Sequence, residues 1–215
     1  MNKIIIACSI ALVSSASVCA SPYVGLEYGV TSVDANYTTN FANDAVSLSP
    51  NETNDAFGGF IGYRFDSIGF EFGYKQYDAD DSRSLHIYPS TKPGFTQERE
   101  WNADVNAKQI TFKPIYFYSV NEKLQLKTGL GLIYTQYKYN SSSHDEFEMI
   151  LIDDIEHNVA RNGGEARKDD VFGAIASLGI EYKVIQNLAI GASVIYQVDS
   201  MASASSFMLT SAYYF

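Results

Sequence analysis

The stretch Gly58-Gly-Phe-Ile-Gly-Tyr-Arg-Phe65, continued by Asp66-Ser67 and Ile68-Gly-Phe-Glu-Phe-Gly-Tyr74, decides the fold. Large apolar side chains occupy every second position in both halves, and glycine, arginine or glutamate mostly occupies the positions between them. Side chains alternate between the two faces of a β-strand, so each half reads as a strand with one large apolar face. The pattern predicts two antiparallel strands joined by a tight turn at Asp66-Ser67.

The same alternation recurs along the chain. Together with 56–65 and 68–75, strands are predicted at 23–31, 105–118, 124–134, 171–182, 188–198 and 204–215. This gives eight strands, an even number, each about 10 residues long, as membrane-spanning strands require. Short turns near Asp66, Asn121 and Gln186 alternate with long connections at 33–54, 78–104 and 140–169, although the last connection, 199–203, is short. The predicted fold class is all-β: an eight-stranded antiparallel transmembrane up-and-down β-barrel with long extracellular loops and both termini in the periplasm.

The polarity of the two faces indicates which one points inward. The large apolar face suits lipid, while the face of glycine, small residues and balanced charges suits a narrow lumen. An eight-stranded barrel is just wide enough for side chains to fill it, which favours a structural polar network over an ion path. We expect this network to comprise Glu27, Arg64, Glu71, Lys75, Lys113, Lys127 and Glu181.

Two further features belong to the strands. Pro114 lies inside a predicted strand and lacks a backbone donor, which predicts a β-bulge there. Aromatic residues near strand ends are expected to form two girdles at the membrane interfaces: Tyr23, Tyr63, Phe65, Tyr74, Tyr118, Tyr134, Tyr182, Tyr196, Tyr213 and Phe215.

Residues 1–20 have the pattern of a secretory signal peptide, with Lys3 before the apolar run Ile4–Val13 and small residues at the predicted cleavage site. The β-barrel domain is then 21–215, exported as a precursor, and both cysteines are lost with the signal. Removing Lys3 changes the net charge from −10 to −11. So acidic a chain is a poor candidate for nucleic-acid binding. After the signal no apolar run is long enough for a transmembrane helix.

The opening strand Tyr23-Val-Gly-Leu-Glu-Tyr-Gly29, the 58–74 hairpin and Ser177-Leu-Gly-Ile-Glu-Tyr182 resemble segments of small OmpA-like outer-membrane barrels. The resemblance covers the whole mature chain in pattern, through loose motifs. It implies an outer-membrane location and a surface role in adhesion, colonisation, virulence or membrane integrity, as for an accessory colonisation factor of this type. It also implies that a terminal aromatic strand is read by the outer-membrane assembly machinery. The matching residues are Phe207, Leu209, Tyr213 and Phe215, while Ser211 departs from the usual apolar residue.

The connection at 140–169 carries most of the acidic charge and has a helical pattern. Ser143 and Glu146 form a capping box, and Gly163-Gly164 would end the helix. A short helix is therefore predicted in this third loop. Its apolar stripe would either bind a host-surface or bacterial partner or pack on the barrel rim as a lid. The stripe consists of Phe147, Ile150, Leu151, Ile155 and Val159.

The three histidines, His86, His144 and His157, all fall in predicted loops, and no predicted strand places a histidine beside a serine on one face. We therefore expect no enzyme, although a lipid-modifying barrel or a protease pairing His157 with Asp153 or Asp154 is a lesser alternative. No cofactor is expected. No spacing of the loop carboxylates matches a defined calcium loop, so no metal site is expected either, although such carboxylates can bridge to lipopolysaccharide phosphates through divalent cations. The expected function is surface display by a monomer in contact with lipid and lipopolysaccharide. A narrow conduit for small molecules is the alternative.

Overall fold

The computed structural model describes residues 20–41, 43–51, 53–150, 156–161 and 163–215. The predicted signal peptide lies, apart from Ala20, outside them and stays a prediction. The described residues form strands and turns, and none of them forms a helix long and apolar enough to cross a membrane. The strands are β1 (Ala20–Ala35), β2 (Thr39–Phe41), β3 (Val46–Leu48), β4 (Thr53–Phe65), β5 (Ile68–His86), β6 (Phe95–Ser119), β7 (Leu124–Met149), β8 (Glu156–Ala160), β9 (Ala166–Lys183), β10 (Leu188–Asp199) and β11 (Ala202–Tyr214).

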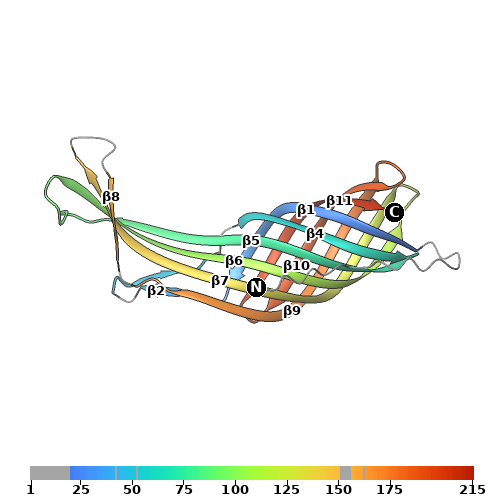
Figure 1. Cartoon of the computed structure of the whole chain (residues 1–215), viewed down its shortest axis with the longest axis horizontal. Helices are drawn as coiled ribbons and strands as arrows, with labels where there is room; N and C mark the ends of the chain where they lie inside the picture. The colour runs from blue at the N-terminus through green and yellow to red at the C-terminus, as the bar shows by residue number, and fades with distance from the viewer. Residues whose placement is uncertain (1–19, 42, 52, 151–155, 162) are drawn as a thin grey trace, which may run out of the picture.

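Eight strands form a closed ring, which confirms the predicted fold class (Figure 1). The nine-stranded sheet runs in the order β6-β5-β4-β1-β11-β10-β9-β7-β8, and β6 also pairs with β7, so all but β8 belong to the ring. The first and last ring strands are antiparallel, with Tyr23 opposite Tyr214. The backbone N–H of Phe215 donates to the carbonyl of Pro22 at 3.0 Å. Closure in this way leaves no open strand edge in the wall of the barrel.

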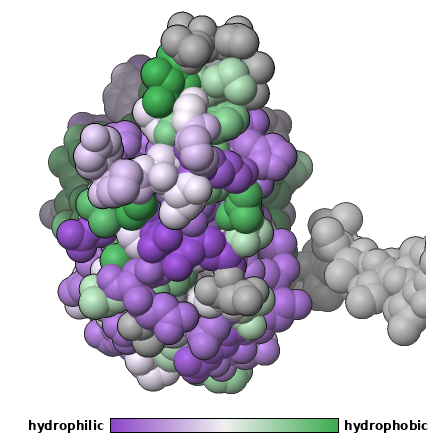
Figure 2. Space-filling view, turned by 90° about the vertical axis from the view of Figure 1, so that its left-hand side faces the viewer, coloured by the Kyte–Doolittle hydropathy of each residue, from purple (hydrophilic) through white to green (hydrophobic). Residues whose placement is uncertain are grey.

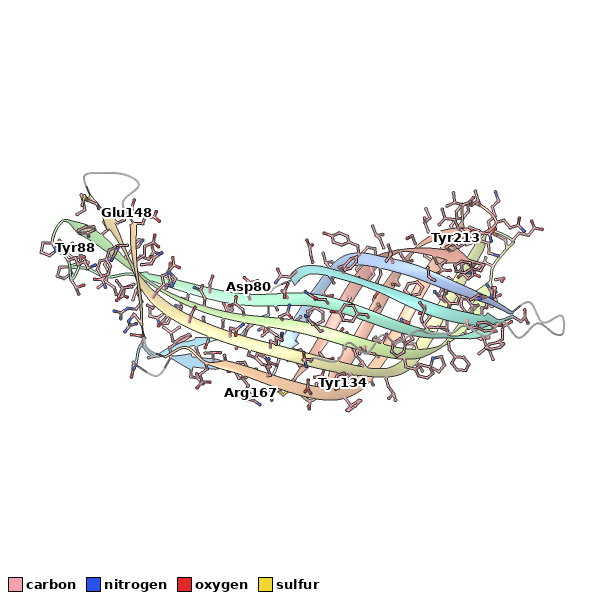
Figure 3. All side chains as sticks on the ribbon, viewed as in Figure 1. Asp80, Tyr88, Tyr134, Glu148, Arg167 and Tyr213 are labelled. Atoms are coloured by element: carbon pink, nitrogen blue, oxygen red, sulfur yellow. The ribbon has the colours of Figure 1, made fainter. Side chains whose placement is uncertain are left out.

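The two faces of the wall have the predicted polarity. Large apolar residues at alternate positions point outward and are exposed, among them Leu26, Ile61 and Phe72. Tyr134 and Tyr213 also point away from the barrel axis (Figure 3). An exposed apolar surface of this extent is stable only in contact with lipid, so these positions mark the membrane-facing band.

Tyr23 is a correction to the predicted aromatic girdles. Its side chain lies inside the barrel, where it is almost fully buried and its hydroxyl donates to Glu71 Oε1 at 3.1 Å. Its ring stacks on Tyr214, and the absence of a side chain at Gly62 leaves the room that it occupies. Side chains alternate between the two faces of β1, and because Val24 faces outward, Tyr23 must face the lumen.

The predicted loops at 78–104 and 140–169 are mostly strand, so a uniform strand length of about 10 residues is wrong for this barrel. β5, β6 and β7 contain 19, 25 and 26 residues, and they extend to one side far beyond the ring (Figure 1). Alternation continues through these segments, but the outward positions change from apolar to polar, as in Asp78, Asp80 and Glu100. The prediction ended each strand where its apolar face ended.

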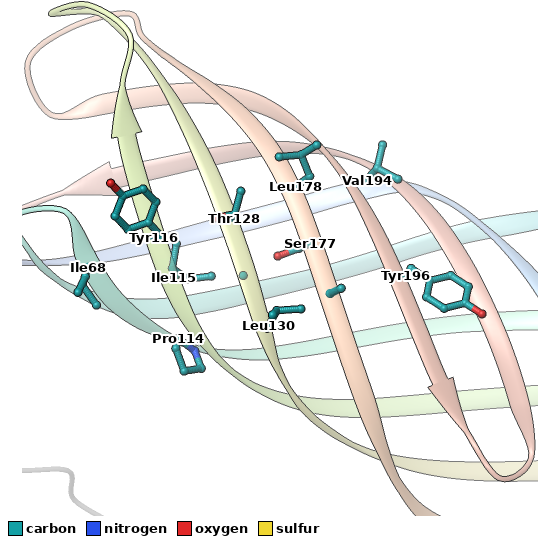
Figure 4. Close-up of a pocket in the computed structure, with 12 residues that line it drawn as sticks. Ile68, Pro114, Ile115, Tyr116, Thr128, Leu130, Ser177, Leu178, Val194 and Tyr196 are labelled. Carbon is teal, nitrogen blue, oxygen red and sulfur yellow. The ribbon is translucent and has the colours of Figure 1, made fainter.

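Pro114 produces no bulge. The β6–β7 register is the same on both sides of it, with Phe112 opposite Leu132 and Ile115 opposite Gly129, and only the two pairs between them are missing. The ladder is interrupted because proline has no N–H to donate toward β7. On the outer wall beside Pro114, the small residues Thr128 and Ala176 leave a groove of about 830 Å³ (Figure 4).

Candidate binding surface on the distal sheet

The strands that extend beyond the ring form a second structural region. We call it the distal sheet: β5 from Asp81, β6 up to Ala103, β7 from Ser141, β8 and the β2–β3 hairpin. It lies at the end of the molecule opposite the short turns (Figure 1). Hydrophilic residues cover most of this end, with hydrophobic residues set between them (Figure 2).

One face of the distal sheet continues the inner wall of the barrel and is covered by the β2–β3 hairpin. Trp101 and Ala103 from β6 are buried there against Phe41, Val46 and Leu48. Trp101 is only 2% exposed, and its indole N–H donates to Asp44 Oδ2 at 3.1 Å. This small apolar core lets the region keep its own structure outside the membrane.

Two aspartates and two arginines beside that core form what we call the ionic clamp: Asp44, Arg99, Asp145 and Arg161. Asp44 lies between β2 and β3 and accepts from Arg99 Nη1 at 3.0 Å and from Arg161 Nη1 at 2.6 Å. Arg99 Nε also donates to Asp145 Oδ1 at 2.7 Å. The clamp therefore joins the hairpin to β6, β7 and the end of β8.

The charges of the clamp stabilise one another. The hydrogen bond from Arg161 holds the pKa of Asp44 below its ordinary value, with further contributions from Trp101 and Arg99. The hydrogen bond from Arg99 to Asp145 raises the pKa of that guanidinium. Partly buried pairs of this kind are screened less by salt than fully exposed ones.

The turn between β5 and β6 forms the tip of the distal sheet. Tyr88 in this turn is 97% exposed, and Leu85 and Ile150 beside it are more than half exposed. The turn is nevertheless fixed, because the backbone N–H of Thr91 donates to Gln97 Oε1 at 2.9 Å and the Ile150 N–H donates to the Gly94 carbonyl at 3.1 Å.

The predicted helix in the third loop is wrong for the described residues. Ser143 and Glu146 do not cap a helix, because they lie in β7 opposite Trp101 and Glu98. Pairing with β6 along this whole segment outweighs the local helical spacing.

The predicted stripe is accordingly not one surface. Phe147 is buried, 4% exposed, beneath the ammonium of Lys92, which lies 4.1 Å from the ring centre. Ile150, in the turn after β7, and Val159, in β8, are exposed on different elements, and Leu151 and Ile155 lie outside the described residues.

Five of the seven predicted lumen residues line one small space inside the barrel. Lys127 Nζ lies 2.6 Å from Glu71 Oε1 and 2.9 Å from Glu181 Oε1, and Lys113 lies 3.3 Å from Glu71. Glu27 lines the same small space, which measures about 30 Å³ and has room for about two waters.

Among the described residues, the other two predicted lumen residues form no hydrogen bond or ion pair with these carboxylates, although Lys75 interacts electrostatically with Glu27. Lys75 donates to Gln197 and Ser206, at 3.1 and 3.0 Å. Arg64 donates to Gln125 at 2.8 Å and lies over the Phe117 ring near the short turns.

The four residues of the predicted assembly signal, three in β11 and Phe215 directly after it, all face outward. Phe207, Leu209 and Tyr213 are about half exposed and Phe215 is 67% exposed. They therefore belong to the lipid-facing band, where the sequence pattern places them.

Sequence reasoning missed the ionic clamp and Trp101. A signal was present, because Gln97, Arg99, Trp101, Ala103 and Val105 occupy alternate positions that continue the inward face of the strand. Asp44 had no such signal, since its role depends on a hairpin that folds back over β6.

Comparison with known proteins places this fold among small outer-membrane β-barrels. Neisserial surface protein A has 14% identity and a TM-score of 0.54, and the alignment covers 91% of this chain and 99% of that one. The attachment invasion locus protein Ail of Yersinia pestis has 14% identity and a TM-score of 0.50, with the same coverage. Identities this low show the shared fold alone. No curated protein sequence matches the chain. Residues 4–215 match the family described as outer membrane protein beta-barrel domain, and the chain belongs to that family.

Proposed function

We propose that this protein is a non-enzymatic surface protein that binds a partner on a host or neighbouring cell through the tip of its distal sheet. The observation that carries the proposal is the position of Tyr88: an almost fully exposed aromatic side chain, held in a fixed turn at the far end of a projecting sheet. Tyrosine is enriched in protein interfaces because it offers a large contact area at low entropic cost.

The construction of the distal sheet supports this proposal. The ionic clamp and the Trp101 core hold its strands together, so binding would not have to order a flexible loop. A surface that is already fixed pays less conformational entropy on binding. Leu85 and Ile150 add exposed apolar area close to the same turn.

The filled lumen favours surface binding over the conduit. Its central lysine is paired with two carboxylates and the space beside them holds about two waters, so an ion would have to displace the network. The arrangement of the histidines gives no support to catalysis. Among the described residues, His144 pairs with Glu100 and His86 with Glu98, and neither contact activates a serine.

The test is cell binding by bacteria that display point variants of the tip. Deleting the third loop, residues 144–162, is a less specific test. It also removes Asp145 and Arg161 from the clamp, so a loss of cell binding could reflect unfolding of the distal sheet. We would instead use Tyr88→Ala combined with Ile150→Ser. The matched control is Val120→Ser, a half-exposed position in a short turn at the opposite end of the barrel.

We expect the tip variant to be displayed normally and to lose at least ten-fold in binding to epithelial cells or matrix, while the control binds as the wild type does. Equal binding by the tip variant would overturn the proposal. Steady single-channel currents in planar bilayers would support the conduit instead.

A further inference from the structure

The outer face of the distal sheet brings a histidine and two glutamates together. Glu100 in β6 lies directly opposite His144 in β7, and Glu146 follows His144 by two residues on the same face of β7. One potential ligand atom from each residue lies within 4.8 Å of the other two. His144 Nε2 and Glu100 Oε2 are already 3.1 Å apart.

This set of donors suits a transition metal. Zn²⁺ binds imidazole nitrogen and carboxylate oxygen at about 2.0–2.2 Å, which places neighbouring ligands of a tetrahedral site about 3.3 Å apart. The His144–Glu100 separation already has that size, and the Glu146 carboxylate, within 4.8 Å of both, would complete the set if its rotamer changed. Ca²⁺ instead prefers six to eight oxygens, and an imidazole is not among its usual ligands.

The local electrostatics also favour a cation. The carboxylates of Glu156, Glu100 and Glu98 lie close enough to the Glu146 carboxylate to repel it. The crowding is built into the register, because Glu98 lies opposite Glu146 on the paired strand. A bound divalent cation would remove this repulsion.

We propose that Glu100, His144 and Glu146 form a binding site for one Zn²⁺ ion. Three protein ligands leave the fourth position to water. Water can reach the site because the His144 and Glu100 side chains are 27% and 32% exposed. The ion would join β6 to β7 on the face opposite the ionic clamp. The distal sheet would then be held together from both sides.

A plain ion pair between His144 and Glu100 is the competing explanation, and calorimetry distinguishes the two. The protein, prepared without a histidine tag and folded in detergent, is titrated with ZnCl₂ and separately with CaCl₂. We expect one Zn²⁺ per chain and no comparable heat from Ca²⁺. His144→Ala and Glu146→Gln should each weaken Zn²⁺ binding by at least ten-fold.

The matched control is His86→Ala. His86 lies on the same face of the same sheet and also pairs with a glutamate, at 3.7 Å from Glu98, but it is 82% exposed. We expect this variant to bind Zn²⁺ as the wild type does. Absence of Zn²⁺ binding, undiminished binding by His144→Ala, or an equal loss in His86→Ala would each overturn the proposal.

Folding of the variants can be checked separately. Trp101 lies buried on the other face of β6, so its unchanged fluorescence would show that the distal sheet is intact.

Discussion

At the scale of single residues, Asp44 connects the β2–β3 hairpin to the rest of the distal sheet. It accepts hydrogen bonds from Arg99, Arg161 and the Trp101 indole. Asp44→Ala removes the acceptor for all three, so we expect the hairpin to undock at a cost of about 2 kcal/mol. Trp101 is the only tryptophan of the chain, and its emission should shift to the red. Asp34→Ala, at an exposed position of β1, is the control and should leave the emission unchanged.

The same carboxylate makes the docking dependent on pH. The hydrogen bond from Arg161 lowers the pKa of Asp44 in the folded protein, so the charged form stabilises the docked hairpin. This stability is fully present above the ordinary aspartate pKa of about 3.9 and is lost as the pH falls through the lowered value. Trp101 emission should therefore be constant between about pH 7 and pH 5 and change only below about pH 4. A transition near neutral pH would contradict this assignment.

In the lumen, Lys127 forms ion pairs with two carboxylates, those of Glu71 and Glu181. Lys127→Met leaves Glu181 without its cation and Glu71 with Lys113 alone. Removing one partner of a buried ion pair costs about 3 kcal/mol or more, and we expect a loss of that size in urea unfolding from lipid vesicles. Lys75→Met is the matched control, because Lys75 donates to Gln197 and Ser206 and should cost less. Equal losses for the two variants would contradict the proposed role of the network.

The sequence predicted which residues face the lumen, but it did not predict their partners. The alternation of side chains along each strand decides whether a residue faces the lumen or the lipid, and this can be read locally at positions such as Glu71 and Glu181. Which lysine reaches both carboxylates depends on the register between β7 and strands that are distant in the sequence. Arg64, which has the same parity, lies too near the short turns to join them and contacts Gln125 instead.

At the scale of whole elements, the third loop shows how a local pattern can mislead. Ser143, Glu146 and Phe147 satisfy a capping box and a helical stripe, and they also satisfy the alternation of a strand. The long neighbouring strand β6 pairs with this segment along its whole length, and Ser143 and Phe147 are buried in the resulting sheet. The sequence of the loop itself does not show that β6 pairs with it, so whether the segment forms a helix or a strand could not be decided from the segment alone.

Element β6 also allows a test of the ladder interruption at Pro114. The Phe117 N–H donates toward β5, to the Ser67 carbonyl, so position 114 has the parity that faces β7. Pro114→Val would supply the missing donor opposite Leu130 and should stabilise the barrel by up to about 1 kcal/mol. Phe112→Val, which already has its donor, should give no gain. Destabilisation by Pro114→Val, measured by urea unfolding in vesicles, would show that the register requires proline.

At the scale of the whole molecule, the chain divides into a lipid-facing band and a distal sheet. The band could be predicted apart from Tyr23, because its signal is a large apolar residue at every second position, as at Leu26 and Phe72. The distal sheet could not, because its outward face is polar and its inward face is covered by a hairpin whose docking depends on Asp44. Membrane burial leaves a pattern in the sequence, whereas pairing between distant polar strands leaves a much weaker one.

A variant of Phe215 can distinguish the stability of the closed barrel from its assembly into the outer membrane. Its backbone N–H bonds to the Pro22 carbonyl, and its side chain points outward. Phe215→Ala keeps that hydrogen bond, so the refolded protein should lose only about 1 kcal/mol in urea unfolding, the order expected for apolar surface that stays in contact with lipid. If the terminal aromatic residue is the assembly signal, however, the amount of protein in the outer membrane should fall several-fold.

Leu130→Ala is the matched control, because it removes an equally outward apolar side chain, 72% exposed, from β7. The two variants should have similar stability, and only Phe215→Ala should accumulate outside the membrane. Equal outer-membrane levels of both variants would show that Phe215 does nothing beyond contacting lipid.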